Sequence, residues 1–290
     1  MVTTPADPVP VPAGVGRTAL GAAMVRAVES RRADRLFHDP YAAAFLAAAP
    51  AVFGREQRGT AALVGGVSSA GVAFWTRAVL RTRFFDDHLL RCAAGGLTQL
   101  VILAAGLDTR AYRLPWPPGT TVFELDLPDV LAFKRHVLAG RRAQPRCAHR
   151  QVPADLHDDF AGPLRAAGLR PDLPTGWLLE GLLIYLSADE TVHVLGTVDA
   201  LSAAGSRAAF EAEPGDTAAA TLRAQAERLP GLQPYAAMWK GGLPDAPGWL
   251  ADRGWLPQRH DGADLAARHG RAVPSSPGGF VTATKSPPAA

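Results

Sequence analysis

The sequence predicts an α/β fold with a mostly parallel, seven-stranded sheet and helices on both faces. Two observations lead to this prediction. Short apolar runs, typical of strands covered on both faces, alternate with segments of helical periodicity through the middle of the chain. Such alternation favours parallel strands joined by right-handed crossover helices. The chain has 290 residues, of which 48% are hydrophobic, so it can also bury a large core.

The first hundred residues are expected to be mainly helical, after a disordered or extended tail. The tail, residues 1–13, is rich in Pro, Val and Asp and has no period. Apolar positions recur at helical spacing over residues 17–33, and a second helix is expected over residues 41–48. A longer apolar stretch predicts a third helix over residues 71–87.

Strand and helix signals then alternate as far as the C-terminus. The expected strands cover residues 100–103, 121–126, 150–155, 177–180, 207–211, 255–259 and 280–284. Helices are expected over residues 127–139, opened by Pro128, and over residues 188–201, with a helical turn at residues 264–268. The last two strands could pair antiparallel at the edge of the sheet.

Composition argues against several classes of protein. The chain has 30 Lys and Arg against 27 Asp and Glu, and the arginines are scattered singly, so we expect no nucleic-acid partner. Cys92 and Cys147 lie far apart without a histidine at ligand spacing, which argues against a disulfide framework and a zinc site. The start lacks the order of a signal peptide, and no apolar run approaches the roughly 20 residues that span a bilayer. We therefore expect a cytosolic protein without metal.

The candidate ligand site lies where the first two strands end. The first strand continues into Ala105-Gly106-Leu107-Asp108, where Gly106 permits close approach of a ligand to the backbone. Asp126 ends the second strand about 20 residues later, the spacing of a carboxylate that accepts hydrogen bonds from ribose hydroxyls. Nicotinamide, flavin and S-adenosylmethionine sites share this pair. A glycine-containing turn and a helix N-cap aspartate would also explain it.

The missing glycines separate these alternatives. A dinucleotide pyrophosphate needs a glycine-rich loop, whereas Ala104 and Ala105 stand where two glycines would help. S-adenosylmethionine has no phosphate, but its methionyl carboxylate needs a cation, for which an arginine fork is suited. Arg83 is the candidate for this contact, although a solvent-facing arginine on a helix is the alternative.

Short motifs spread over nearly the whole chain after residue 14 carry a family resemblance. They occupy residues 16–20, 26–30, 39–42, 81–86, 105–114, 123–128, 155–156, 180–186, 205–207 and 279–285. In these motifs the chain resembles bacterial S-adenosylmethionine-dependent methyltransferases related to leucine carboxyl methyltransferase. One departure is Ala104, because the family usually has glycine before Ala-Gly-Leu-Asp. The extra methyl group narrows the loop and could reduce cofactor affinity.

The resemblance implies a Rossmann-like class I methyltransferase with an N-terminal helical cap, a lid insertion and S-adenosylmethionine as cofactor. The implied cofactor-binding residues are Arg26, Arg83, Ala105, Gly106, Asp126, Leu127, Asp155, Leu156 and Glu180. Among them, Asp126 is implied to bind ribose, and Asp155 with Leu156 to contact adenine. Arg83 would pair with the methionyl carboxylate, Arg26 would be a second basic contact, and Glu180 would close the floor of the site.

The predicted organisation is a single methyltransferase domain over residues 14–290. Its parts are a helical cap at 14–94, a cofactor-binding core at 95–213, a lid and acceptor region at 214–254, and a C-terminal sheet edge at 255–290. Tyr185, Tyr235 and Trp239 could contact the methyl acceptor. Tyr235 and Trp239, which lie in the lid region, could instead only pack the lid.

We expect O-methylation of a carboxylate or hydroxyl of a small molecule, such as a polyketide-like acid of secondary metabolism. A carboxylate is favoured because it is already ionised at neutral pH and needs no general base. No catalytic residue and no oligomeric state can be assigned. A non-catalytic S-adenosylmethionine-binding protein remains an alternative, followed by a nicotinamide-dependent oxidoreductase.

Two weaker motifs point to other functions. Residues 14–19 superficially fit a dinucleotide fingerprint, but they follow a proline-rich tail and not a strand. Residues 66–70 nearly match the nucleophile elbow of a hydrolase, but Ala70 stands where glycine is needed. Neither motif is expected to be functional.

Overall fold

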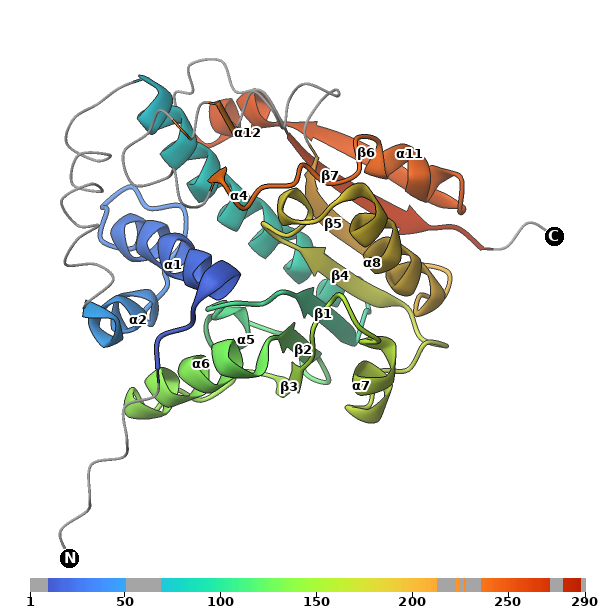
Figure 1. Cartoon of the computed structure of the whole chain (residues 1–290), viewed down its shortest axis with the longest axis horizontal. Coiled ribbons are helices and arrows are strands. Elements are labelled where there is room, and N and C mark those ends of the chain that lie inside the picture. Colours follow the sequence, from blue (N-terminus) through green and yellow to red (C-terminus); the bar gives the residue numbers. More distant parts are fainter. Residues whose placement is uncertain are drawn as a thin grey trace, which may run out of the picture.

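A seven-stranded sheet forms the centre of the protein (Figure 1). The computed structural model describes residues 10–50, 69–212, 223–224, 227, 236–271 and 279–287. The strands are β1 (Gln99–Leu103), β2 (Thr121–Asp126), β3 (Ala148–Pro153), β4 (Thr175–Leu179), β5 (Arg207–Ala212), β6 (Trp255–Asp261) and β7 (Gly279–Lys285). Their order is β3-β2-β1-β4-β5-β7-β6, and the pairs among β1 to β5 are parallel. The predicted fold class is confirmed.

The last two strands do pair antiparallel, but β7 lies inside the sheet. It pairs with β5 on one side and with β6 on the other, so β6 forms the edge. The third and fourth strands begin and end earlier than expected. As a result, Asp155 and Glu180 follow their strands and lie in the loops at the carboxyl ends.

Helices cover both faces of the sheet. They are α1 (Thr18–Glu29), α2 (Ala42–Ala48), α4 (Ser69–Ala94), α5 (Arg110–Arg113), α6 (Pro128–Gly140), α7 (Ala161–Ala166), α8 (Ala188–Ala200), α11 (Ala246–Ala251) and α12 (Gly262–Arg268), with 3-10 turns η1 (Gly14–Arg17) and η2 (Leu183–Tyr185). Pro128 opens α6 as expected. The short helices α5, α7 and α11 were not predicted, because one or two turns are too short to show a period.

Two expected helix ends are wrong. The first helix stops at Glu29 and not at residue 33, because Ser30 turns the chain: its hydroxyl donates to the Arg26 carbonyl and accepts from the Asp39 amide. Helix α4 continues past residue 87 to Ala94, because Leu89 and Cys92 extend its buried face beyond the two aspartates at 86 and 87.

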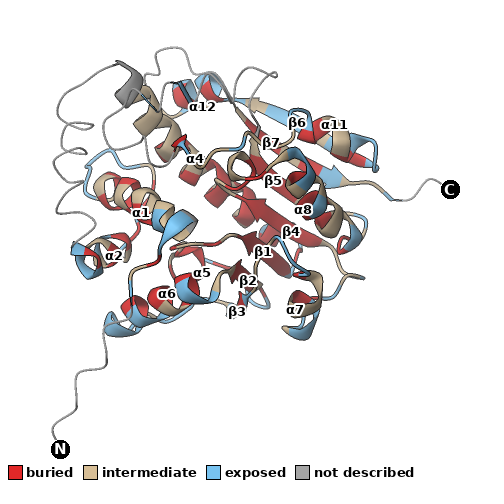
Figure 2. Ribbon diagram, viewed as in Figure 1, coloured by how far each residue is buried: buried red, intermediate tan, exposed pale blue. Residues whose placement is uncertain are grey.

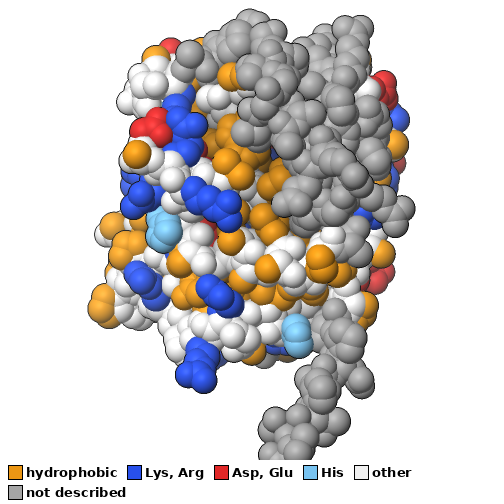
Figure 3. Space-filling model, turned by 90° about the vertical axis from the view of Figure 1, so that its left-hand side faces the viewer, with side chains coloured by type: hydrophobic (Ala, Val, Ile, Leu, Met, Phe, Trp, Pro, Cys, Tyr) orange, Lys and Arg blue, Asp and Glu red, His pale blue; other side chains and the backbone are white. Residues whose placement is uncertain are grey.

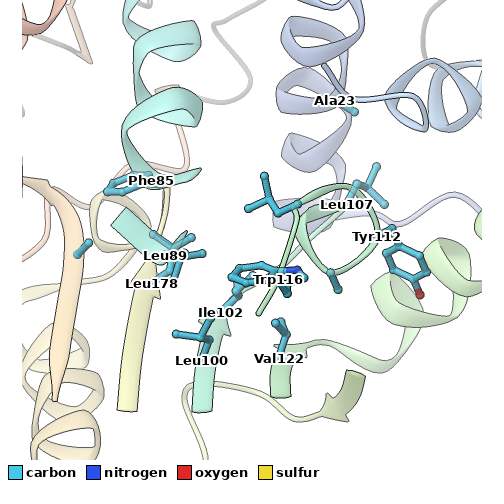
Figure 4. Close-up of a cluster of buried hydrophobic side chains, with 14 of the residues drawn as sticks. Ala23, Phe85, Leu89, Leu100, Ile102, Leu107, Tyr112, Trp116, Val122 and Leu178 are labelled. Atoms are coloured by element: carbon cyan, nitrogen blue, oxygen red, sulfur yellow. The ribbon is translucent and has the colours of Figure 1, made fainter. Parts of the chain in front are cut away.

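Alternate residues of the strands supply two core clusters, one on each side of the sheet. In β1, Leu100 and Ile102 face the helices α1, α2, α4 and α6, whereas Val101 and Leu103 face α7, α8 and α11. Figure 4 shows the first cluster, with Leu89 of α4 against Leu178 of β4. Every residue of β1 and β4 is buried, and Figure 2 shows these strands at the centre of the buried region.

The predicted tail is partly outside the described residues, which begin at Pro10. Within residues 10–13, Pro12 is buried and Val11 packs against the core, so this part of the tail is ordered against the domain. Helix α4 packs on β1, β4 and β5 and therefore belongs to the layer that covers the sheet. The division into cap, core, lid and edge otherwise stays a prediction. Across the described residues, no helix is long and apolar enough to cross a membrane.

Candidate cofactor site at the carboxyl ends of the strands

The loop after β1 and the end of β2 form one hydrogen-bonded unit. The Gly106 amide donates to Asp126 Oδ2 at 2.6 Å, and the Leu127 amide donates to Asp126 Oδ1 at 2.7 Å. The Ala105 amide donates to the Leu125 carbonyl at 2.9 Å. Burial raises the pKa of Asp126, although the two amide donors oppose this shift. The structure thus brings together four of the residues predicted from the sequence.

This unit lies at the point where the strand order reverses. The chain runs from β1 outward to β2 and β3 and then returns to β4 on the other side of β1. In open parallel sheets the ligand crevice lies outside the carboxyl ends of the strands at this position. Both Gly106, after β1, and Glu180, after β4, flank it.

The loop has a left-handed backbone at two positions. Gly106 has a φ of 51°, and an added Cβ atom there would lie 3.0 Å from Ala19 Cβ, so α1 packs directly over the loop. Ala104 has a φ of 48° although it carries a side chain. A left-handed conformation costs a residue with a Cβ atom about 1 to 2 kcal/mol. Ala104 therefore occupies a position that the backbone reserves for glycine.

A belt of alternating charges crosses the carboxyl ends of β1, β4 and β5. The residues of this charged belt are Asp86, Asp108, Glu180, Glu211, Arg81, Arg110 and Arg113. Arg110 Nη1 lies 2.7 Å from Glu180 Oε2 and also contacts Asp108 Oδ2, so it joins the ends of β1 and β4. Arg81 Nε lies 2.9 Å from Glu180 Oε1, and Arg81 Nη1 lies 3.1 Å from Glu211 Oε1. Arg81 thereby extends the belt to β5.

Nearby arginines favour the ionised forms of two belt carboxylates, Asp108 and Glu180. Burial opposes the charge of Asp108, but Arg110 together with Lys134, Arg113 and Arg26 outweighs it and lowers the pKa of Asp108 to about 2. Burial likewise opposes the charge of Glu180, and Arg110 with Arg81 lowers its pKa below the ordinary value. Asp86 accepts from Arg110 Nε at 2.7 Å and from both terminal nitrogens of Arg113. The belt therefore contains one carboxylate more than it contains guanidinium groups.

The structure brings Arg81, and not Arg83, to Glu180. Arg83 Nε donates to Asp87 Oδ2 at 2.9 Å, and Arg83 Nη1 donates to the Leu36 carbonyl at 3.0 Å. Two residues along a helix correspond to about 200° of rotation, so the side chains of Arg81 and Arg83 leave α4 on opposite sides. Arg83, the residue predicted to pair with the methionyl carboxylate, therefore does not contact Glu180, and its contact with the cofactor stays a prediction.

Arg26 connects α1 to the loop after β1. Its Nε donates to Asp39 Oδ2 at 2.8 Å, and its Nη2 donates to the Leu107 carbonyl at 2.6 Å. Thr109 Oγ1 also donates to Asp39 Oδ2, at 2.7 Å. This arrangement fastens the N-terminal helices to the candidate cofactor loop. A direct contact between Arg26 and the cofactor stays a prediction.

The predicted adenine contacts lie just beyond β3. Asp155 is half-exposed, and its Oδ1 accepts from the His157 amide at 2.9 Å. Leu156 packs against the core cluster on the α7 and α8 side. The Ala154 amide donates to the Asp126 carbonyl at 3.0 Å, which ties the end of β3 to the end of β2. Asp126 ends β2 and Asp155 follows β3, so both lie at the carboxyl ends of neighbouring strands.

Two of the three predicted acceptor contacts are within the described residues. Tyr185 lies in η2, near Arg81. Burial lowers the pKa of Arg81, but Glu180, Glu211 and, to a smaller extent, Tyr185 raise it above the ordinary value. Backbone amides of Lys240 and Gly241 donate to the Ile184 carbonyl, so the segment that follows Trp239 lies against η2. Tyr235 lies outside the described residues. The indole Nε1 of Trp239 is buried and has no hydrogen-bond partner among the residues that the structure describes.

Arg81, Arg110 and Glu211 were not predicted as site residues, and Asp108 was named only as the end of the candidate loop. Asp108, Arg110 and Arg81 were inside motifs that had been recognised, but nothing in the motifs says which side chains meet. Glu211 ends a predicted strand, as Asp126 does, and this position was the signal that could have found it.

The side of the molecule that carries α1, α2 and the start of α4 is partly apolar (Figure 3). Hydrophobic side chains gather across it between scattered Lys and Arg side chains.

In the described part of the chain, no group of three or more His, Cys, Asp or Glu side chains could hold a metal ion.

Comparisons with known proteins agree with one another. The family profile described as leucine carboxyl methyltransferase matches residues 19–199. A protein of Parafrankia sp. (strain EAN1pec), provisionally named an S-adenosyl-L-methionine-dependent methyltransferase, is 46% identical over 277 residues, which cover 94% of this chain and 88% of that protein. A protein of Frankia alni with the same provisional name is 48% identical over 284 residues, which cover 96% of this chain and 97% of that protein.

A solved structure shares the fold. The crystal structure of a provisionally named methyltransferase from Thermobifida fusca YX matches with a TM-score of 0.51 and 19% sequence identity. The match covers 84% of this chain and 92% of that chain. At this identity, the likeness concerns the fold alone.

Proposed function

The chain belongs to the leucine carboxyl methyltransferase family, and from this premise we propose that it transfers a methyl group from S-adenosylmethionine to an oxygen of a small molecule. The relatives are named as S-adenosylmethionine-dependent methyltransferases, which overturns the nicotinamide-dependent oxidoreductase alternative. We propose a carboxylate as the first choice of acceptor and a hydroxyl as the second. A polyketide-like acid of secondary metabolism has the required chemistry.

The residues at the carboxyl ends fit this cofactor by the chemistry of their donors and acceptors. The Asp126 carboxylate can accept hydrogen bonds from ribose hydroxyls, and Arg81 with Glu180 offers opposite charges to the carboxylate and ammonium of the methionyl group. Arg81 Nε is buried and makes no well-directed hydrogen bond, although Glu180 Oε1 lies only 2.9 Å from it. This nitrogen has capacity for a further acceptor.

We therefore assign the proposed roles residue by residue. Ala105, Gly106 and Leu127 line the cofactor beside Asp126, and Asp155 with Leu156 contacts adenine. Arg81 takes the contact with the methionyl carboxylate that sequence analysis gave to Arg83, because Arg81 is the arginine beside Glu180.

The preference for a carboxylate acceptor depends on one observation. In residues 10–50 and 69–212, the carboxylates of Asp108, Glu180 and Glu211 at the strand ends are all paired with arginines. Such pairing lowers the pKa of Asp108 and Glu180, so these carboxylates are poor general bases. An acceptor that is already ionised needs no base. A carboxylic acid meets this condition at neutral pH.

The protein then has to bind, align and dehydrate the reactants. The cofactor supplies a methyl group that is activated by its sulfonium leaving group. The protein's contribution is to hold the acceptor oxygen in line with that methyl group and to exclude water. Within the described part of the chain, Trp239 Nε1 is a buried donor without a partner, and an acceptor oxygen within its reach would satisfy it. This supports Trp239, next to the segment that contacts η2, as an acceptor contact.

The test uses radiolabelled S-adenosylmethionine with panels of small carboxylic acids, phenols and alcohols. Methyl esters release volatile methanol in alkali and methyl ethers do not, so alkaline treatment distinguishes the two acceptor classes. We expect alkali-labile label from the acids. Label that is stable in alkali would contradict the carboxylate preference and favour a hydroxyl acceptor.

The control is an Asp126→Ala protein in the same assay, together with calorimetric binding of S-adenosylhomocysteine. This variant should lose cofactor binding and methyl transfer together. Unchanged cofactor affinity in Asp126→Ala would undo the site assignment. A wild-type protein that binds the cofactor but labels no acceptor class would favour the non-catalytic alternative.

A further inference from the structure

Glu211 lies at the carboxyl end of β5 and faces the same side of the sheet as α4. Its neighbour Phe210 belongs to the core cluster on the α8 side, whereas Ala209 belongs to the cluster on the α4 side. Because side chains alternate along a strand, Glu211 shares the face of Ala209. This orientation brings its carboxylate to Arg81, on α4.

The Glu211 carboxylate holds two groups at once. Its Oε1 and Oε2 accept the Gly181 amide at 3.1 and 2.8 Å, and its Oε1 also accepts Arg81 Nη1 at 3.1 Å. The side chain is only 15% exposed, so both contacts are largely shielded from water.

Gly181 and Arg81 are also fitted to each other. Gly181 has a φ of 61°, in the left-handed region that favours glycine, and a Cβ atom there would lie 3.3 Å from Arg81 Nη1. The turn after β4 that presents Glu180 therefore runs close beside the guanidinium group. The Glu211 carboxylate contacts both the Gly181 amide and the Arg81 guanidinium group.

The guanidinium group of Arg81 is consequently held between two carboxylates. Glu180 Oε1 lies 2.9 Å from Nε, and Glu211 Oε1 lies 3.1 Å from Nη1. A free arginine side chain has many rotamers, and each anchor removes part of this freedom before a ligand binds. Loss of Glu211 would free one end of Arg81 and leave the Gly181 amide without its acceptor.

We propose that Glu211 is a positioning residue for the methionyl end of the cofactor site. Glu211 holds Arg81 and the Glu180-Gly181 turn in the binding arrangement and does not contact the cofactor itself. This inference rests on the proposed assignment of Arg81 and Glu180 to that end of the site. It differs from a general stabilising role, because the printed contacts of Glu211 among the described residues are with Arg81 and Gly181 and do not include Asp126 or Asp155, at the adenosine end.

The experiment compares two ligands that differ only at the amino-acid end. S-adenosylhomocysteine carries the whole amino-acid group, whereas methylthioadenosine has the same adenosine and thioether without it. Calorimetry gives both dissociation constants for the wild type, Glu211→Ala and Glu211→Gln, and the melting temperature monitors folding. Asp172→Asn, which removes an exposed carboxylate paired with Arg170, is the matched control.

We expect Glu211→Ala to weaken S-adenosylhomocysteine binding about tenfold, the size of one lost hydrogen bond to a charged group, and to leave methylthioadenosine binding unchanged. Glu211→Gln keeps an acceptor for the Gly181 amide but loses the charge that faces Arg81, so its loss should be smaller. Asp172→Asn should change neither constant. Equal weakening of both ligands, or unchanged binding of both in Glu211→Ala, overturns the proposal.

Arg81→Ala separates this inference from the assignment on which it rests. If Arg81→Ala removes the preference for S-adenosylhomocysteine over methylthioadenosine and Glu211→Ala does not, only the role of Glu211 fails. If Arg81→Ala leaves that preference intact, the proposed methionyl site itself is wrong. Should Glu211→Ala fail to fold, the Glu211→Gln protein carries the same comparison.

Discussion

Replacement of Ala104 by glycine should leave the protein at least as stable as the wild type. Ala104 is one of two residues other than glycine with a positive φ in the described part of the chain, and the other is Arg142, with a φ of 51°. In most buried loops, removal of a methyl group destabilises the fold. Ala104→Gly should be an exception, because the left-handed backbone strains alanine and not glycine.

The magnitude follows from opposing contributions. Relief of the left-handed strain is worth about 1 to 2 kcal/mol. The greater freedom of glycine in the unfolded chain costs about 0.4 to 1 kcal/mol. Ala104 packs only partly against the core, so the lost contact adds a smaller penalty. We expect a net change between zero and about 1 kcal/mol of stabilisation.

Ala105→Gly is the matched control. Ala105 is the next residue, is 6% exposed and has no positive φ. Its replacement should destabilise the protein by about 1.5 kcal/mol through chain entropy and the lost methyl group. The two variants should therefore differ by about 2 kcal/mol, or roughly 5 °C in melting temperature for a protein of this size.

Thermal or urea unfolding of both variants, with Arg142→Gly as an exposed site of similar φ, provides the measurement. If Ala104→Gly is destabilised as much as Ala105→Gly, the strain argument is wrong. Calorimetry with S-adenosylhomocysteine on the same proteins tests the separate prediction that the Ala104 methyl group lowers cofactor affinity.

Three further predictions concern the site. Arg81→Ala should weaken S-adenosylhomocysteine binding at least tenfold in calorimetry. Arg83→Ala should change this binding less than about twofold, because Arg83 contacts Asp87 and the Leu36 carbonyl. A larger loss of affinity in Arg83→Ala than in Arg81→Ala would favour Arg83 as the methionyl contact. Asp39→Ala leaves Arg26 buried without its ion pair and should cost about 3 kcal/mol in urea unfolding, and a loss below 1 kcal/mol would show that the contact between Arg26 and Asp39 is weak. Burial raises the pKa of Asp126, whose ionised form is the proposed acceptor for ribose hydroxyls. Cofactor affinity should therefore be constant at neutral pH and begin to fall at a higher pH than the ordinary aspartate value of 3.8 would give. Affinity that stays flat down to pH 4 would contradict this shift.

Much of the fold could be predicted because the strands are encoded locally. The run Leu100-Val101-Ile102-Leu103 is apolar at every position since β1 is buried on both faces, and the period of α6 begins at a proline suited to a first helical turn. The insertion of β7 between β5 and β6 could not be read in the same way. Strand neighbours depend on contacts between distant segments, and the positions of β6 and β7 in the sheet are set by such contacts.

The sequence by itself determined the family and the cofactor through motifs spread along the chain, and it placed Gly106 and Asp126 at strand ends that the hydrophobic pattern defines. Only the tertiary structure decided which charged side chains meet. The choice between Arg81 and Arg83 depends on the rotation of α4 relative to the sheet, and the contact of Glu211 with Gly181 joins residues 30 positions apart. Ala104 illustrates both levels: the sequence marked it as unusual, and its φ of 48° supplied the physical reason. Short-range patterns fix strands and helices, whereas the packing between them fixes the chemistry of the site.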